Sequence, residues 1–347
     1  FEGAEAANPN TSNWDTSAVI AMNGMFNGAT SANPDVQLWD TSNVTAMNAM
    51  FHGATIANPN TSGWNTSNVL SLSQTFHGAT AANPDVSQWD TSNVLSMIYM
   101  FASGPLYTPV VSLWNTGNVT NMQGMFSGAT TLNPDVSLWD TSQVTDMSAM
   151  FYGASVANPD VSAWDTSSVQ TMARMFWGAA SANPSVGGWD TSSVTDISGM
   201  FEGASSANPD VSGWNTSNVT NMSNVFTNAV LADPAVGGWD TSNVHTMAYM
   251  FEGTDVANPD VSGWNVSNVT DFDQMFKGAK LADPDVSNWD VSSAQYMRRV
   301  FRLTRVANPD VSSWNLASVI NMRGMFRGAR LANPDVSNWV FPNANSI

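Results

Sequence analysis

Residues 135–159 read DVSLWDTSQVTDMSAMFYGASVANP, and the rest of the 347-residue chain repeats this unit with small changes. A phenylalanine starts the count at Phe1 and returns every 25 residues up to Phe326. A tryptophan keeps the same interval from Trp14 to Trp339. Neither column contains an insertion or a deletion, so the sequence predicts one repeat array over residues 1–347 and not a chain of unrelated domains.

Two secondary-structure elements are predicted within each unit. Residues 136–139 are a short β-branched and aromatic run between turn residues, which predicts a strand. The apolar residues that follow, Val144, Met147, Met150 and Phe151, have the spacing of one helical face and predict a helix. Ser142 is its candidate N-cap and Gly153 its candidate C-cap. We therefore expect an α/β repeat solenoid of about fourteen strand-turn-helix coils with a parallel sheet on one face.

An Asn-Pro pair ends most units and turns the chain into the next one. If the coils stack in parallel, each amide lies one coil from the next and can bond to adjacent backbone or to its neighbour. This spacing predicts a buried structural ladder of asparagines, which includes Asn33, Asn58, Asn83, Asn133 and Asn158.

The phrase WDTSNVTxMxxMF occurs at residues 39–51 and, with small changes, at residues 214–226 and 239–251. It resembles the short repeats of the BspA-like, leucine-rich-repeat-related bacterial surface proteins first catalogued in mycoplasma lipoproteins. The resemblance covers essentially the whole chain. It implies a leucine-rich-repeat-like solenoid at the cell surface or in secreted material, used for adhesion or binding, with no catalytic residues to transfer. The 25-residue step and the NPDVS phrase depart from the family pattern.

Composition excludes several classes of function. The chain has no cysteine, so disulfides, thiolate metal sites and thiol catalysis are not available. A net charge of −18 argues against a nucleic-acid partner. No apolar run approaches the ~20 residues of a membrane span. The sequence starts at Phe1, within a repeat and without an initiator methionine, so we expect a processed chain or a fragment.

The basic residues are concentrated toward one end, since nine of the ten lie between Lys277 and Arg330. Six of these nine occupy the repeat positions that Glu2 and Glu5 hold in the first unit, with Lys277, Arg302 and Arg327 at one and Lys280, Arg305 and Arg330 at the other. Two copies stacked head to tail would match these charges, and an open contact of this kind builds fibres. The alternative is a solvated basic face, with residues 340–347 as a C-terminal cap.

Other departures from the repeat give weaker candidates. In the irregular coil at residues 101–112 two prolines replace the usual phrase, which predicts a kink or an altered loop. Tyr152 and Trp177 share a repeat position and suit either sugar stacking or ordinary packing. His52 and His77 share it too, and surface histidines are favoured over a metal site. The aspartate columns at Asp35 and Asp40 suit turn and cap roles, with calcium as the alternative.

These observations favour a non-enzymatic extracellular or cell-surface structural protein that assembles head to tail into filaments, without a cofactor. The first alternative is an adhesin or glycan-binding surface module, so the expected partner is a second copy or a surface glycan or protein. The second alternative is an ice-binding protein that uses a regular column of threonines: Thr16, Thr41, Thr66, Thr91 and Thr116.

Overall fold

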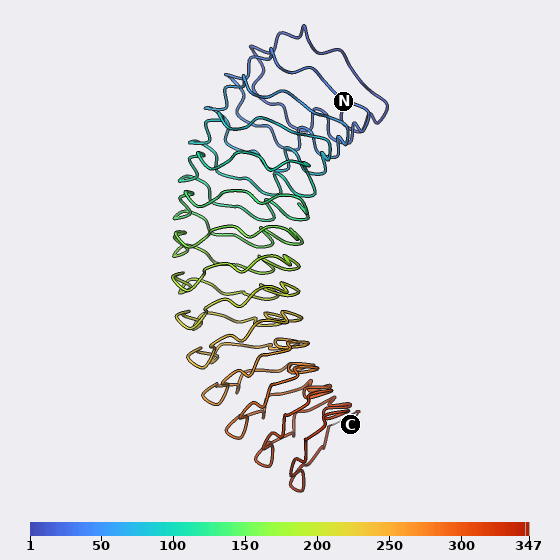
Figure 1. Ribbon diagram of the computed structural model, residues 1–347, viewed down its shortest axis with the longest axis vertical. Coiled ribbons are helices and arrows are strands. Elements are labelled where there is room, and N and C mark those ends of the chain that lie inside the picture. Colours follow the sequence, from blue (N-terminus) through green and yellow to red (C-terminus); the bar gives the residue numbers. More distant parts are fainter. Residues whose placement is uncertain (344, 347) are drawn as a thin grey trace. The chain divides into compact units, whose positions relative to one another are not determined.

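The computed structural model describes residues 1–343, 345 and 346. They form two compact units, Phe1–Val169 and Gln170–Ile347, and each is described by itself. Within each unit the 25-residue repeats form coils stacked one on the next (Figure 1). That residues 1–347 form one array stays a prediction.

The expected strand-turn-helix coil is wrong. The described residues contain no helix, and no strand longer than a single bridging residue. Each coil contributes one residue to isolated parallel bridges with its neighbours, as Ala46 does with Ala21 and Ser71, and Asp271 with Thr246 and Tyr296. The molecule is therefore a stack of turn-built repeats and not an α/β solenoid with a parallel sheet.

The predicted strand is a turn. At residues 136–139 the Trp139 N–H donates to the Val136 carbonyl across 3.2 Å, which closes a four-residue turn. The tryptophan side chain faces inward, and its indole N–H donates to the carbonyl 28 residues earlier, for example from Trp139 to Val111 across 3.0 Å. The β-branched and aromatic run at residues 136–139 therefore forms a turn, with the side chains of Val136 and Trp139 buried, and not a strand.

The predicted helix is a series of turns, which is clearest in the coil around Ala49. Alternate N–H groups, those of Met47, Ala49, Phe51 and Gly53, donate to carbonyls of the next coil across 2.7–3.2 Å. The N–H groups between them close four-residue turns, such as His52 to Ala49. Ala49 and Gly53 have φ of 52° and 65°, which interrupts a right-handed helix. Inter-coil bonds thus take the donors that a helix would use internally.

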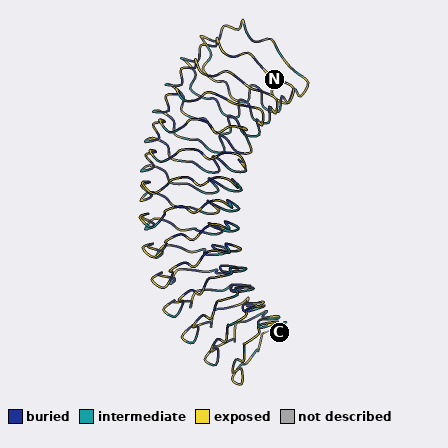
Figure 2. Ribbon diagram, in the orientation of Figure 1, coloured by how far each residue is buried: buried dark blue, intermediate teal, exposed yellow. Residues whose placement is uncertain are grey.

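Apolar residues fill the inside of each coil. Phe51 is fully buried and its ring stacks on those of Phe26 and Phe76 at centroid distances of 5.6 and 5.7 Å. In the second unit Phe201 stacks on Phe176 and Phe226, both at 5.8 Å. Figure 2 shows buried and exposed stretches alternating along each coil. The phenylalanine of each coil is therefore buried against those of its neighbours.

The irregular coil at residues 101–112 keeps this core. Phe101 stays fully buried and stacks on Phe76 and Phe126 at 5.8 Å each, so the change is confined to the outer loop. Gly104 is required there, because a Cβ on it would lie 2.7 Å from the carbonyl oxygen of Phe76. The altered loop exposes Leu106 and Tyr107.

Candidate binding face

Charged and aromatic variation between the repeats is concentrated at four positions. They are the bridging residue and the residues two, three and six places after it, and we call their surface the variable face. Four of the five tyrosines and seven of the ten basic residues occupy these positions. The other three basic residues share the position nine places after the bridging residue with Glu5 and Asp255, and two exposed positions alternate between aspartate and asparagine. The remaining exposed positions vary largely among small, aliphatic and amide side chains such as Leu38 and Leu138. The sequence pattern pointed to one of these four positions, that of Tyr152 and Trp177, and the other three were missed, although aligning the repeats by position shows their variation as well.

Contacts within the second unit show that these positions form one surface. Lys277 donates to Gln274 of its own coil and pairs with Glu252 of the preceding coil, at 2.7 and 2.6 Å. Arg298 forms an ion pair with Asp273, whose side chain is 2% exposed. Side chains of adjacent coils are therefore within reach of one another across the variable face.

An acidic hollow of about 300 Å³ lies on this face. Glu202, Asn224, Tyr249 and Glu252 contribute to its lining. Burial raises the pKa of Glu202, although a hydrogen bond from the Trp177 side chain opposes the shift. Burial also raises the pKa of Asp271. From Arg298 onward, the charged residues of this face are arginines and no longer acidic residues.

The basic residues predicted to form an interface divide into two groups. Lys277 pairs with Glu252, and Lys280 pairs with Asp255, both across 2.6 Å. Within the described part of the chain, no ion pair involves the four arginines of the prediction, namely Arg302, Arg305, Arg327 and Arg330. At the other end, Glu2 accepts a hydrogen bond from Asn27 across 3.1 Å, and Glu5 is exposed.

Arg302 is the least exposed of these arginines, and its Nε atom is buried without a hydrogen-bond partner in the described structure. A buried donor without an acceptor is costly. Arg302 is therefore a residue of the variable face whose hydrogen bonding is incomplete within the described structure.

Tyr152 and Trp177 do not lie within one unit, since Tyr152 belongs to Phe1–Val169 and Trp177 to Gln170–Ile347. Both are half-buried on the variable face of their own unit. Their pairing as a sugar platform stays a prediction.

The asparagine column forms a ladder from coil to coil. The N–H of Asn58 donates to Oδ1 of Asn33 across 2.9 Å, and the N–H groups of Asn83 and Asn158 bond in the same way to Asn58 and Asn133 at 2.8 and 2.9 Å. These side chains are exposed, whereas a buried ladder was expected. A surface ladder suffices because each bond satisfies a backbone donor at the coil edge.

The aspartate columns form turns. Ser87 donates to Oδ1 of Asp85 through its hydroxyl at 2.7 Å and its backbone N–H at 3.1 Å. The hydroxyl bond, followed by the backbone bond, lowers the pKa of Asp85. The carboxylates are thus engaged within their own turns. Within the described part of the chain, no group of three or more His, Cys, Asp or Glu residues is arranged to hold a metal ion.

The threonine column is internal. Thr41 and Thr66 are 1% exposed, and their hydroxyls donate to the carbonyls of Asn65 and Asp90 at 2.9 and 3.0 Å. Because these hydroxyls face the next coil, the column presents no threonine surface to solvent. The observation that suggested ice binding is therefore accounted for by coil stacking.

His52 and His77 stack on the variable face with ring centroids 4.6 Å apart. Tyr99 stacks on the other side of His77 at 6.0 Å. Nδ1 of His77 is buried without a hydrogen-bond partner in the described structure. Burial, and then the neighbouring His52, lowers the pKa of His77. Protonation of His77 is therefore disfavoured in the folded chain.

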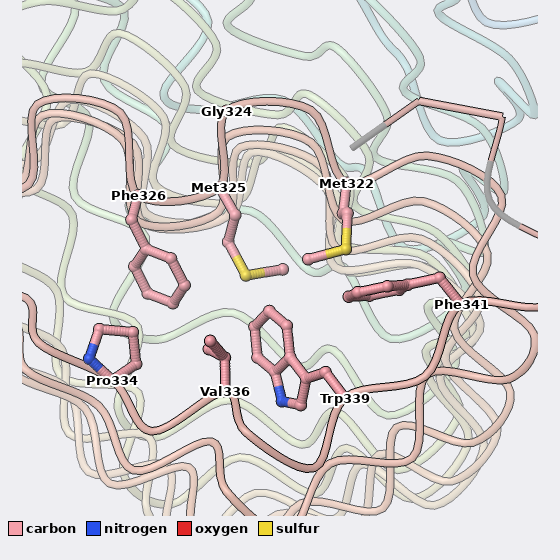
Figure 3. Close-up of a pocket in the computed structure, with 8 residues that line it drawn as sticks. All are labelled: Met322, Gly324, Met325, Phe326, Pro334, Val336, Trp339 and Phe341. Carbon is pink, nitrogen blue, oxygen red and sulfur yellow. The ribbon is translucent and has the colours of Figure 1, made fainter.

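The last coil leaves core residues uncovered. An apolar cavity of about 400 Å³ lies there, and Figure 3 shows Met325 and Phe326 pointing from one side of the coil toward Val336 and Trp339 on the other. Phe341 packs its ring edge against Trp339.

Residues 340–347 were predicted to be a cap or an interface. Of the described ones, Val340 is exposed, Asn345 bonds to Ile320, and Ser346 forms a bridge to Asn321, so this segment follows the repeat pattern. Residues 344 and 347 of the predicted segment lie outside the described residues.

The residues that the structure describes include no helix long and apolar enough to cross a membrane. Comparison with curated proteins and with solved structures gave no match. A family model does match the chain in six overlapping segments, at residues 1–108, 70–183, 104–214, 155–260, 204–306 and 254–347. This supports the Mycoplasma-type part of the resemblance, while the BspA-like, leucine-rich-repeat assignment is not shown. Because the matches together span the whole length, the chain belongs to the family described as Mycoplasma protein of unknown function, DUF285.

Proposed function

We propose that this chain is a non-enzymatic repeat protein of the cell surface or extracellular space, and that it binds a partner through the variable face. One observation carries the proposal: the repeated polar residues are engaged in holding coils and turns together, while charged and aromatic side chains differ from coil to coil on one surface of each unit. Repeat proteins commonly use such an extended surface for binding.

The repeated polar groups are engaged in structural bonds. Ser87 is bound to its turn carboxylate, Thr66 to the carbonyl of Asp90, and Asn68 to the carbonyl of Ser42 across 2.7 Å. Hydroxyl and carboxylate groups of these columns thus serve the fold, which leaves the variable face as the surface for specific recognition. The surface location is supported by the membership in a Mycoplasma repeat family together with the resemblance of the WDTSNVTxMxxMF phrase to surface-protein repeats.

The proposal is tested with matched variants of the full chain on an array of glycans and extracellular-matrix proteins. The face variant is Tyr249→Ala/Arg302→Gln, and the control is Leu231→Ser/Leu281→Ser, which changes two leucines that are 54% and 51% exposed at another surface position. We expect the face variant to lose array binding and the control to keep it. Equal loss in both, or full binding by a face variant with native circular dichroism, contradicts the proposal.

End-to-end association is a second candidate, favoured by the ion pairs of the second unit. The pairs Glu252–Lys277 and Asp255–Lys280 show that opposite charges at these two repeat positions pair across adjacent coils. Arg327 and Arg330 of one copy would meet Glu2 and Glu5 of another in the same two positions. Electron microscopy should show salt-sensitive filaments that Arg327→Glu/Arg330→Glu abolishes and an equal mixture with Glu2→Arg/Glu5→Arg restores. Isolated particles at all salt concentrations contradict it.

A further inference from the structure

The second unit carries a concentrated positive patch in an otherwise acidic chain. All seven arginines between residues 298 and 330 belong to it, and with one aspartate, Asp310, they give this segment a net charge of +6. We call these seven residues the arginine patch. Five of them lie on the variable face: Arg298, Arg299, Arg302, Arg323 and Arg327.

Most of this charge is not neutralised within the chain. The neighbouring cations Lys277 and Lys280 each have a carboxylate partner at 2.6 Å, and Arg298 is paired with Asp273. Among the described residues, the other six arginines of the patch form no ion pair. The buried Nε of Arg302 adds an orphaned donor at the centre of the patch.

The arginines are stacked in pairs one coil apart. Arg298 and Arg323 share a repeat position, and so do Arg302 and Arg327. The phenylalanines of these two coils, Phe301 and Phe326, have ring centroids 5.5 Å apart, which sets the spacing between the coils. A guanidinium group carries a fork of N–H donors that suits the planar or trigonal oxygens of carboxylates and sulfates, and such groups recur here from one coil to the next.

An aromatic ring lies beside these arginines. Tyr296 is the bridging residue of the same coil as Arg298, and it is 39% exposed. An exposed aromatic ring with a polar tip suits the apolar face of a sugar. Inorganic anions would use the arginines alone, whereas a saccharide uses both.

From these contacts we propose that the arginine patch and Tyr296 bind an anionic glycan, a saccharide chain that carries sulfate or carboxylate groups. This inference rests on the proposed binding role of the variable face and names the ligand class of one part of it.

A long, uniform polyanion fits the surface less well. In the same unit, the variable face next to the patch carries Glu252, Asp271 and Asp273, and Asp273 is already occupied by Arg298. Nucleic acid or an anionic membrane would extend from the arginines onto these carboxylates and be repelled. A short charged segment of a glycan engages only the two arginine-bearing coils.

The test measures binding of a heparin-derived octasaccharide to the full chain by fluorescence polarisation in 50 mM salt. We expect Arg302→Gln and Arg327→Gln each to weaken binding by about tenfold to a hundredfold, because each removes charge-assisted hydrogen bonds. The matched control Arg174→Gln removes the one cation of this face outside the basic segment and should change binding by less than about twofold, since screening isolates distant charges.

Tyr296→Ala separates a sugar site from a simple anion site. We expect it to weaken octasaccharide binding by about tenfold, the loss of one stacked ring. Protection of the arginines from phenylglyoxal by inorganic sulfate should not change in this variant.

Four results would overturn the inference. The first is that the wild-type chain does not bind the octasaccharide although it still binds the array through the variable face. That result would overturn this inference and leave the proposed function intact. Equal losses in Arg302→Gln and Arg174→Gln would show unspecific attraction. Single-stranded DNA or phosphatidylserine vesicles that bind as tightly, without dependence on Tyr296, would show a general polyanion site. Self-association through the patch that Glu2→Gln/Glu5→Gln abolishes would identify a second copy as the occupant.

Discussion

Replacing Ala49 by glycine distinguishes the turn-built coil from a helical one by the sign of its effect. Ala49 has a φ of 52° and lies at the position where the repeat pattern predicts a helix interior. An L-residue in the left-handed region costs roughly 1–2 kcal/mol, which glycine avoids. Glycine also makes the unfolded chain more flexible, at a cost of roughly 0.4–1 kcal/mol. The net expectation for Ala49→Gly is a stabilisation of about 0.5–1 kcal/mol.

The assay is urea unfolding followed by tryptophan fluorescence, with the midpoint compared at constant slope. Gly24 holds the same position in the preceding coil with a φ of 59°, and a Cβ there meets only the Glu2 side chain at ordinary contact distance, so Gly24→Ala should have the opposite effect. Ala54→Gly is the control, because Ala54 is buried and has no positive φ. A helix interior predicts a loss of about 1 kcal/mol for Ala49→Gly, and that result would refute the turn structure.

Three further predictions concern single contacts. The free energy of unfolding should fall as the pH drops below about 6.5, because His77 is protonated more readily in the unfolded chain than in the folded chain. In His77→Gln this contribution to the pH dependence of the free energy of unfolding should be absent. Thr216→Val should lower the free energy of unfolding in urea by about 1 kcal/mol, because the hydroxyl bond to the Asp240 carbonyl at 2.9 Å is lost. A valine fits this repeat position, since Val266 is buried there. A change near zero would place the Thr216 hydroxyl in solvent. Gly104→Ala should cost about 1–3 kcal/mol, since its Cβ would press on backbone oxygens, and an unchanged thermal midpoint would contradict the close packing.

The 25-residue register, the buried apolar columns and the inter-coil asparagine bonds all follow from the sequence. They depend on which residues recur, and recurrence is visible without coordinates. The backbone conformation was not predictable in the same way, because Val144, Met147 and Met150 recur every three residues in a series of turns as they would in a helix. One contrary signal was present: the segment is rich in Ser, Thr, Asn and Asp, which are weak helix formers and favour turns.

The candidate face was only partly predictable. Arg302 and Arg327 stand out by charge, but their grouping with Tyr296 depends on which repeat positions share a surface, and a helical reading of the coil places these positions differently. The internal pairing of Lys277 and Lys280 also required coordinates, because their partners lie one coil away. Position-by-position alignment of the repeats would have found the variation without revealing which cations remain unpaired.

Hydroxyl-radical footprinting of the full chain, alone and with an array ligand bound, tests the binding role of the variable face most directly. Tyr249 and Tyr296 report on this face, and Leu231 and Leu281 report on another exposed surface of the same unit. We expect protection of one or both tyrosines with unchanged labelling of the two leucines. Protection of the leucines with unprotected tyrosines would place the partner elsewhere and contradict the proposed function.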